Sequence, residues 1–160
     1  MPGTREAQGG SERGFTLVEL ILVMVIAGIL AAVAVPRLVG RNGFDTRGFA
    51  DQLAATVRFA QKLAVAQHTN VFVRLTTSDA TLCYDAACAT PAPGPGGEKP
   101  YTVSAPGGVA IARPLAALAF DPAGRPQTAA LLDIQTQLDI QVNGSGTHHV
   151  YVERETGYVH

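Results

Sequence analysis

The first hydrophobic pattern along the chain is a continuous apolar run from Phe15 to Val35, whose only charged residue is Glu19. As a helix, a run of this length would extend about 31 Å, at 1.5 Å per residue, which matches the hydrocarbon core of a bilayer. Pro36 follows directly. Because proline lacks an N–H group and collides with the carbonyl four residues back, Pro36 is predicted to end or kink this helix.

A second, amphipathic helix is predicted from about Phe49 to His68. Its apolar side chains recur at helical spacing on one stripe, and its charged side chains lie elsewhere. The stripe consists of Phe49, Leu53, Val57, Ala60 and Ala64, whereas the charged residues include Asp51, Arg58 and Lys62. A helix of this kind can pack its apolar stripe against a sheet.

After Asn70 the hydrophobic period changes to two residues, which indicates short strands. Strands are predicted at Val71–Leu75, Thr81–Tyr84, Tyr101–Ser104, Val109–Ala112, Leu118–Asp121, Leu131–Thr136, Leu138–Val142, Val150–Val152 and Tyr158–Val159. The Pro- and Gly-rich segment Ala89–Pro100 is expected to be an exposed loop. The expected fold class is α+β, with a long N-terminal helix that is apolar in its first half and amphipathic in its second, packed on an antiparallel β-rich head.

Length and composition limit what else the chain contains. Its 160 residues suffice for one globular head but hardly for two independent domains. Residues 1–14 hold both charge signs without an apolar period and are predicted to be a disordered leader. The predicted organisation is a leader over 1–14, a transmembrane and assembly helix over 15–41, and a head over 42–160. A formal net charge of −1 provides no whole-molecule field that would attract nucleic acid or anionic membrane.

The two cysteines, Cys83 and Cys88, are separated by four residues. In an oxidising compartment this pair could close a small hairpin-like loop as a disulfide, and free thiols are the alternative. Zinc is the least favoured option, because a structural site needs about four ligands and only His68 is near in sequence. No metal and no cofactor are predicted.

An enzyme is the function class with least support from the sequence. Gly94–Gly97 contains the glycines of a phosphate loop, but Pro93 and Pro95 remove N–H donors and no Lys-Ser/Thr pair follows. The neighbouring His148 and His149 alternate faces on a strand, so one exposed and one partly packed imidazole are expected there. No catalytic residues are predicted, and a membrane-anchored periplasmic enzyme remains a rival hypothesis.

The residues Arg13-Gly14-Phe15-Thr16-Leu17-Val18-Glu19-Leu20 resemble the leader junction of type IV pilins and type II secretion pseudopilins. Unlike the cut site of a secretory signal peptide, Gly14 precedes the apolar segment, so that segment would be kept. The resemblance implies that a prepilin peptidase cuts after Gly14 and that Phe15 is N-methylated. It also implies that Glu19 is the family's assembly glutamate and that Pro36 is its helix-breaking proline.

Glu19 is the most informative of these residues, because an ionised carboxylate in hydrocarbon costs at least a few kcal/mol. One interpretation is that Glu19 lies near the lipid headgroups and is solvated. The other is that Glu19 pairs with the α-amino group of Phe15 in a neighbouring subunit. The two charges would then offset each other only on assembly, and the pairing would define the axial register.

The rest of the chain resembles the GspH/FimT group of minor subunits more loosely, and minor pilins of mannose-sensitive haemagglutinin systems are similar too. The resemblance lies in three segments, Arg58–Ala66, Phe120–Arg125 and Glu155–Val159. Two departures are notable. The leader is less basic than usual, and the cysteines are mid-chain, which favours a minor subunit over a major pilin.

The predicted function is therefore a minor pilin or pseudopilin subunit of a type IV pilus or type II secretion system. Its expected partners are other subunits, the prepilin peptidase, an inner-membrane assembly platform and, before assembly, membrane lipid. It would start as a single-pass inner-membrane protein with a periplasmic head and end in a periplasmic pseudopilus or surface pilus. The alternative is a FimT-like subunit that binds DNA. Nucleic acid is disfavoured, because after Pro114 two basic residues stand against five acidic ones.

Overall fold

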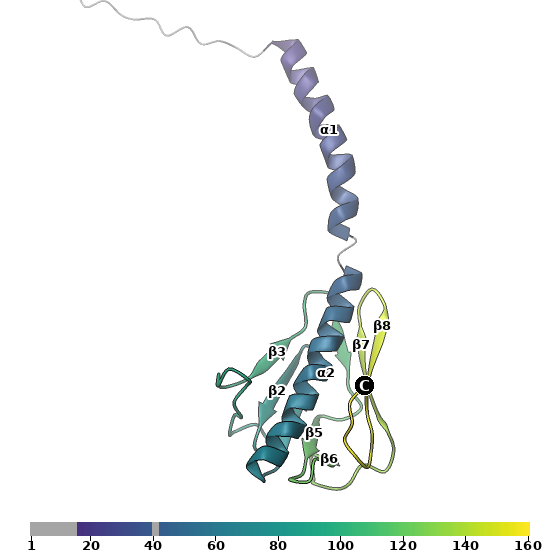
Figure 1. Ribbon diagram of the computed structural model, residues 1–160. Helices are drawn as coiled ribbons and strands as arrows, with labels where there is room; N and C mark the ends of the chain where they lie inside the picture. The colour runs from purple at the N-terminus through teal and green to yellow at the C-terminus, as the bar shows by residue number, and fades with distance from the viewer. Residues whose placement is uncertain (1–15, 40–41) are drawn as a thin grey trace, which may run out of the picture. The chain divides into compact units, whose positions relative to one another are not determined.

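The computed structural model describes residues 16–39 and 42–160, which belong to two units that divide between Gly40 and Arg41. The first unit contains helix α1, Leu17–Val39 (Figure 1). This helix continues past Pro36 to Val39, so Pro36 does not end it, and a kink there stays a prediction. Within the described part of the chain, no helix has the length and apolar character required to cross a membrane. The predicted leader, 1–14, and Phe15 lie outside the described residues.

The head begins with helix α2, Asn42–Gln67, which starts seven residues before the predicted Phe49. The earlier start places Asp45 in the first turn, where a carboxylate interacts favourably with the helix dipole. The predicted stripe is confirmed, because Phe49, Leu53, Val57, Ala60 and Ala64 are all buried in the core. The helix ends where His68 adopts a positive φ of 51°.

Eight strands follow, and every pair is antiparallel. They are β1 Val71–Leu75, β2 Asp79–Cys83, β3 Thr102–Ser104, β4 Ala110–Ala112, β5 Ala117–Phe120, β6 Pro126–Thr128, β7 Leu138–Asn143 and β8 Thr147–Val152. They form a five-stranded sheet in the order β3-β2-β1-β5-β6 and a three-stranded sheet in the order β4-β7-β8. The predicted class, a long N-terminal helix followed by an antiparallel β-rich head, is confirmed.

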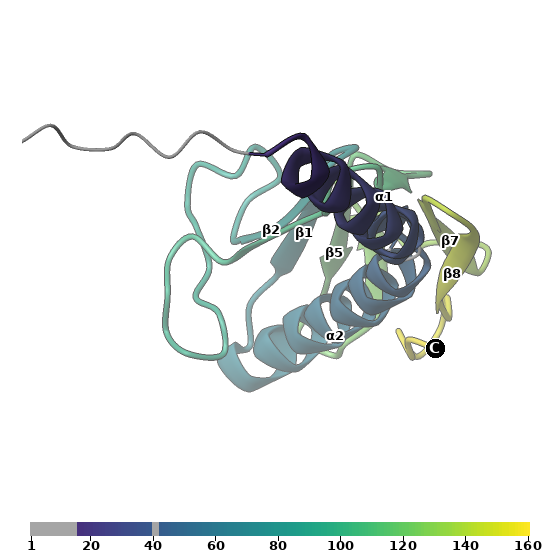
Figure 2. The ribbon, with the colours of Figure 1, turned by 90° about the horizontal axis from the view of Figure 1, so that it is seen from above.

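The core lies between α2 and the inner faces of both sheets. In Figure 2, α2 lies across the sheet that contains β2, β1 and β5, with β7 and β8 beside it, and α2 packs against both β1 and β8. Leu82, Leu118 and Phe120 are among the largest fully buried side chains on the five-stranded sheet. Its opposite face carries a smaller cluster of Phe72, Cys83 and Ala119, against which Cys88 packs.

Two of the predicted strands are wrong. Leu131–Thr136 is not a strand, because Leu131 adopts a positive φ of 59° and its N–H donates to the carbonyl of Thr128, which closes a tight turn. The only β-pairing described for this segment is an isolated antiparallel bridge between Asp133 and Gln127. Tyr158–Val159 likewise contributes an isolated bridge, from Val159 to Val152.

The strand that the sequence pattern missed is β6, which begins at Pro126. A proline is tolerated there because β6 is an edge strand and pairs with β5 alone in its sheet.

The predicted exposed loop, Ala89–Pro100, is irregular as expected, but part of it is buried. Ala92 is fully buried, because its N–H donates to the carbonyl of Leu82 and holds the returning chain against β2.

Candidate functional site

The described surface of α1 is almost entirely apolar and exposed. From Leu17 to Leu30 its large apolar side chains retain between 48% and 75% of their accessible surface. A helix that is apolar on all sides requires burial in lipid or protein, and an exposed patch of this size marks an interaction surface. The candidate functional site of the first unit is therefore the helix surface itself, not a cleft.

Glu19 lies in the first turn of α1 and has a local structural role. The hydroxyl of Thr16 accepts the N–H of Glu19 at 3.3 Å, and the carbonyl of Thr16 accepts that of Leu20 at 3.2 Å. Thr16 therefore caps the helix, with a glutamate three residues later as in a capping box. Helix capping explains why an acidic residue lies near the N-terminal end of α1. It does not explain why Glu19 lies within an otherwise apolar helix surface.

The surroundings of the Glu19 side chain supply the second part of the account. Apolar atoms of Glu19, Leu20, Val23 and Met24 line an open hollow of about 380 Å³. Any partner that covers these apolar side chains would also remove the carboxylate from water, which is costly unless an opposite charge accompanies it. The geometry thus allows a charge-selective contact at Glu19. Gly14 and Phe15, the predicted cleavage and methylation residues, lie outside the described part of the chain.

In the head, the three segments that carry the looser resemblance meet at one hydrogen-bond junction on α2. The amide of Gln61 donates to the carbonyls of Gly124 at 2.8 Å and Thr156 at 2.7 Å. One turn earlier, Arg58 Nε donates to the carbonyl of Val159 at 3.1 Å. The helix therefore holds the turn between β5 and β6 and the C-terminal segment in fixed positions. The sequence pattern did not identify Gln61, because its partners are backbone carbonyls far along the chain.

The turn held by Gln61 is built on Asp121, which is 94% buried. One carboxylate oxygen accepts the N–H groups of Ala123 at 2.9 Å and Arg125 at 2.8 Å, and the other accepts Arg125 Nε at 2.9 Å. Burial acts to raise the pKa of Asp121, but the hydrogen bonds and the charge of Arg125 outweigh it and lower the pKa below the ordinary 3.8. Asp121 is thus a structural carboxylate.

We expect the head to lose stability in acid through Asp121. Because its folded-state pKa is depressed, its contribution is fully present above the ordinary value of 3.8 and is lost as the pH falls through the lower folded value. Asp121→Asn should destabilise the head by about 2 kcal/mol at pH 7, since a buried acceptor of charge-assisted bonds is replaced. Urea unfolding at several pH values measures both effects. Asp133→Asn, at an exposed position, is the control, and an equal loss of stability in both variants would contradict this role.

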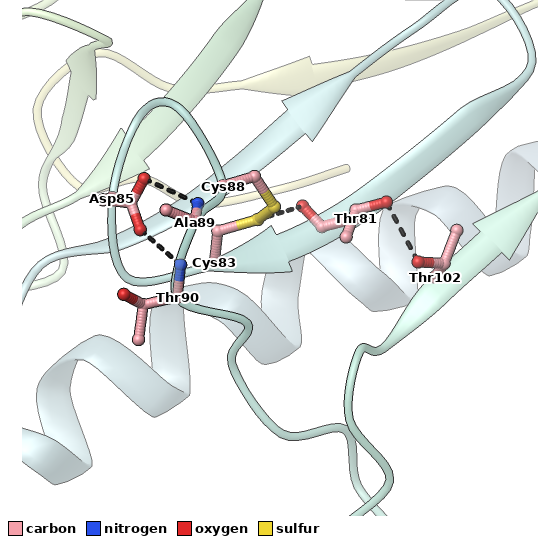
Figure 3. The surroundings of a disulfide bond; sticks show 7 residues. All are labelled: Thr81, Cys83, Asp85, Cys88, Ala89, Thr90 and Thr102. Atoms are coloured by element: carbon pink, nitrogen blue, oxygen red, sulfur yellow. Dashed lines mark hydrogen bonds between the residues drawn. A yellow bond between two sulfur atoms is a disulfide. The ribbon is translucent and has the colours of Figure 1, made fainter.

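The cysteine pair lies at the end of β2, where Cys83 and Cys88 are joined by a disulfide with Cα atoms 5.1 Å apart (Figure 3). Inside the loop, Asp85 accepts the N–H groups of Ala89 at 3.0 Å and Thr90 at 2.7 Å, and these bonds lower its pKa. The disulfide covers Phe72 on the face of the sheet that α2 does not cover. Its position supports a role in closing the small outer cluster.

We predict that Cys83 and Cys88 are oxidised to each other in the native protein. Labelling with a thiol reagent without reductant should modify neither residue, and labelling after reduction should modify both. A double Cys→Ser variant should unfold with about 2 kcal/mol less free energy, because a short unfolded-state loop is no longer closed. Thr90→Ser is a control for sequence change in the same loop. Two freely reactive thiols in untreated protein would contradict the prediction.

Other chemistry has little support among the described residues. They contain no group of three or more His, Cys, Asp or Glu side chains that could hold a metal ion. His148 and His149 lie on β8, the first half-buried and the second exposed, as their alternation predicted. Beyond Pro114, both basic side chains are paired with carboxylates, Arg125 with Asp121 and Arg154 with Glu155. The other acidic side chains there are therefore not offset by a basic residue of this segment. This distribution of charge disfavours a phosphate-binding surface on the C-terminal part of the head.

Comparisons with known proteins agree with this geometry. A model of the prokaryotic N-terminal methylation motif matches residues 10–35. Over 55 residues, 34% of this chain, the sequence is 47% identical to the type IV narrow pilus major component PilA5 of Thermus thermophilus. That match covers 47% of PilA5, so the chain spans about half the length of this curated relative.

Two crystal structures of the type IV minor pilin FimU of Pseudomonas aeruginosa share the fold, each with a TM-score of 0.54. The alignments cover 71% of this chain and 85% and 90% of the FimU chains, at 12% and 13% identity. At such identity the likeness concerns the fold alone. The methylation motif and the partial sequence match make this chain similar to type IV pilins, and its fold is that of a minor pilin.

Proposed function

We propose that the protein is a minor subunit of a type IV filament that is cut between Gly14 and Phe15, methylated at Phe15 and assembled through α1. The observation that carries this proposal is the exposed apolar surface of α1 with a single carboxylate, Glu19, in its first turn. A surface of this kind is stable only when neighbouring helices or lipid cover it. Its role is structural, and no catalytic step is part of the proposal.

The partners in this proposal follow from the route to the filament. A prepilin peptidase removes residues 1–14, the apolar run from Phe15 to Val35 holds the subunit at the inner membrane, and an assembly platform transfers it to other subunits. The head then faces the periplasm, an oxidising compartment in which the Cys83–Cys88 disulfide is stable. Since both named relatives belong to type IV pili, we favour a pilus over a secretion pseudopilus.

Mass spectrometry of the membrane-extracted and filament-bound protein tests the proposal. We expect a mature chain that begins at Phe15 and carries one additional methyl group, in both fractions. Gly14→Leu should keep residues 1–14 attached and should be absent from sheared filaments, because the cleavage position is blocked. Gly10→Leu, a matched change inside the leader, should be processed normally. A mature chain that still contains residues 1–14, or a cut beyond Val35, would refute the processing step.

A further inference from the structure

The outward face of the three-stranded sheet carries a row of exposed aromatic rings. Side chains of β8 alternate between the core, where Val150 and Val152 are buried, and the outer face, where His149 and Tyr151 lie. The outer row continues onto the C-terminal segment, which pairs with β8 through hydrogen bonds of 2.8 and 3.0 Å between Tyr151 and His160. We name the row formed by His149, Tyr151, His160 and Tyr158 the ring strip.

Neighbouring rings of the ring strip are in contact along its whole length. The ring centroids are 5.6 Å apart between His149 and Tyr151, 5.5 Å between Tyr151 and His160, and 5.5 Å between His160 and Tyr158. The terminal ring, Tyr158, is 63% exposed. These side chains make no part of the hydrophobic core, so their alignment does not follow from the packing of the head. Exposed, ordered aromatic rings are typical of recognition surfaces.

Carboxylates fix both histidines of the ring strip. Asp139 on β7 contacts His149 Nδ1 at 3.0 Å, and Glu153 contacts His160 Nε2 at 3.1 Å. Glu153 also accepts a hydrogen bond of 2.6 Å from the Gln137 amide. The rings are therefore preorganised before any partner binds, which reduces the conformational entropy that binding would otherwise cost.

The charge around the ring strip indicates the chemistry of its partner. An open hollow of about 340 Å³ is lined by Glu153, which contacts His160, and by Arg154, Glu155 and Thr156. With Asp139, the surroundings contain three carboxylates and two guanidinium groups. Arg154 is engaged by Glu155 at 2.8 Å and by the Gln135 carbonyl, and Arg58 donates to the carbonyl of Val159 at 3.1 Å. Carboxylates outnumber guanidinium groups here, so the surface favours a cationic partner over phosphate.

A guanidinium matches both features of this surface. The planar guanidinium of arginine stacks on aromatic rings and forms bidentate hydrogen bonds with carboxylates. The compact ammonium of lysine does not stack and pairs with a carboxylate as a point charge. We propose that the ring strip, with Glu153 and Asp139, binds an arginine-bearing segment of another protein. This surface belongs to the head alone, and the inference does not depend on the processing or assembly of the N-terminal helix.

Surface plasmon resonance with the full-length protein in detergent tests the inference. The immobilised probes are short synthetic peptides of alternating arginine and glycine, lysine and glycine, or aspartate and glycine. The arginine peptide should bind at least about tenfold more tightly than the lysine peptide, and the aspartate peptide should not bind. Tyr158→Leu should weaken binding of the arginine peptide about tenfold, and because this ring is exposed, the variant should fold normally.

The carboxylate contribution has a matched control. Glu153→Gln should weaken binding of the arginine peptide at least about fivefold, whereas Glu98→Gln removes an equal charge from an exposed loop and should leave binding unchanged. Circular dichroism melting of each variant separates lost binding from lost folding. Equal binding of the arginine and lysine peptides, or unchanged binding by Tyr158→Leu, would overturn the inference. Tighter binding of an oligosaccharide or a single-stranded oligonucleotide than of the arginine peptide would do the same.

Discussion

Gly157→Ala should destabilise the head by at least about 3 kcal/mol, because alanine adds both backbone strain and a collision. Gly157 has a positive φ of 66°, a conformation that side chains other than that of glycine rarely adopt. A Cβ atom there would meet the carbonyl oxygen of Gly124 and would lie 2.6 Å from Gln61 Nε2 and 3.1 Å from Phe120 Cε1. Gln61 and the carbonyl of Gly124 are bonded to each other in the junction on α2, so neither can retreat without disturbing it.

Urea unfolding followed by circular dichroism measures this loss. Gly146→Ala is the matched control, because a Cβ atom at Gly146 would have nothing within 4 Å, and its stability should change by less than about 1 kcal/mol. Gln61→Leu should fall between the two, since it removes the amide but leaves the backbone free to relax. If Gly157→Ala unfolds at the same urea concentration as the unchanged protein, the junction is not a determinant of head stability.

The helical stripe and the first strand were predictable because their signals are local. Phe49, Leu53 and Val57 are buried at the spacing that the sequence shows, and β1 has the predicted bounds Val71–Leu75. In both cases the hydrophobic period of the segment matches the face that the fold buries. The alternation of Leu138–Asn143 with buried Leu138, Ile140 and Val142 follows the same rule.

The errors occurred where long-range pairing outweighs the local pattern. The apolar residues Leu131 and Leu132 suggested a strand, but both are exposed in a turn that closes on Thr128. Conversely, the sequence pattern indicated no strand at Pro126–Thr128, yet β5 offers this segment an edge position where no donor is required of the proline. Propensity gives no information on which of these segments finds a partner strand.

The features of the head that carry its chemistry were the least predictable. The ring strip requires Tyr151 and His160 to pair, and the sequence pattern gave Tyr158–Val159 as a strand without a partner. The junction at Gln61 depends on two turns that are 63 and 95 residues away. By contrast, Glu19 was identifiable from sequence, because a single charge in an apolar run is conspicuous wherever the helix lies.

Glu19→Ala should reduce entry of the subunit into filaments at least about tenfold while leaving its membrane level and cleavage after Gly14 unchanged. Glu19 shares an open hollow with Leu20, Val23 and Met24, so a neighbouring helix that covers these side chains would also cover Glu19. In the pairing interpretation of Glu19, the α-amino group of Phe15 in that neighbour supplies the opposite charge. Removing one partner of a buried pair leaves the other uncompensated, at a cost of about 3–5 kcal/mol.

Two further variants separate charge from helix capping. Glu19→Gln keeps size and hydrogen bonding but deletes the charge, and should be nearly as defective as Glu19→Ala. Thr16→Ala removes the hydroxyl that accepts the N–H of Glu19, and should lower filament entry only slightly, since a cap contributes about 1 kcal/mol.

Each variant is expressed beside the unchanged major subunit, filaments are sheared off, and the subunit is quantified in filament and membrane fractions. Filaments per cell are counted as well, because a subunit at the tip would use Glu19 only to recruit its first neighbour. Unchanged filament ratios and filament numbers for both Glu19 variants would rule out charge pairing at this residue.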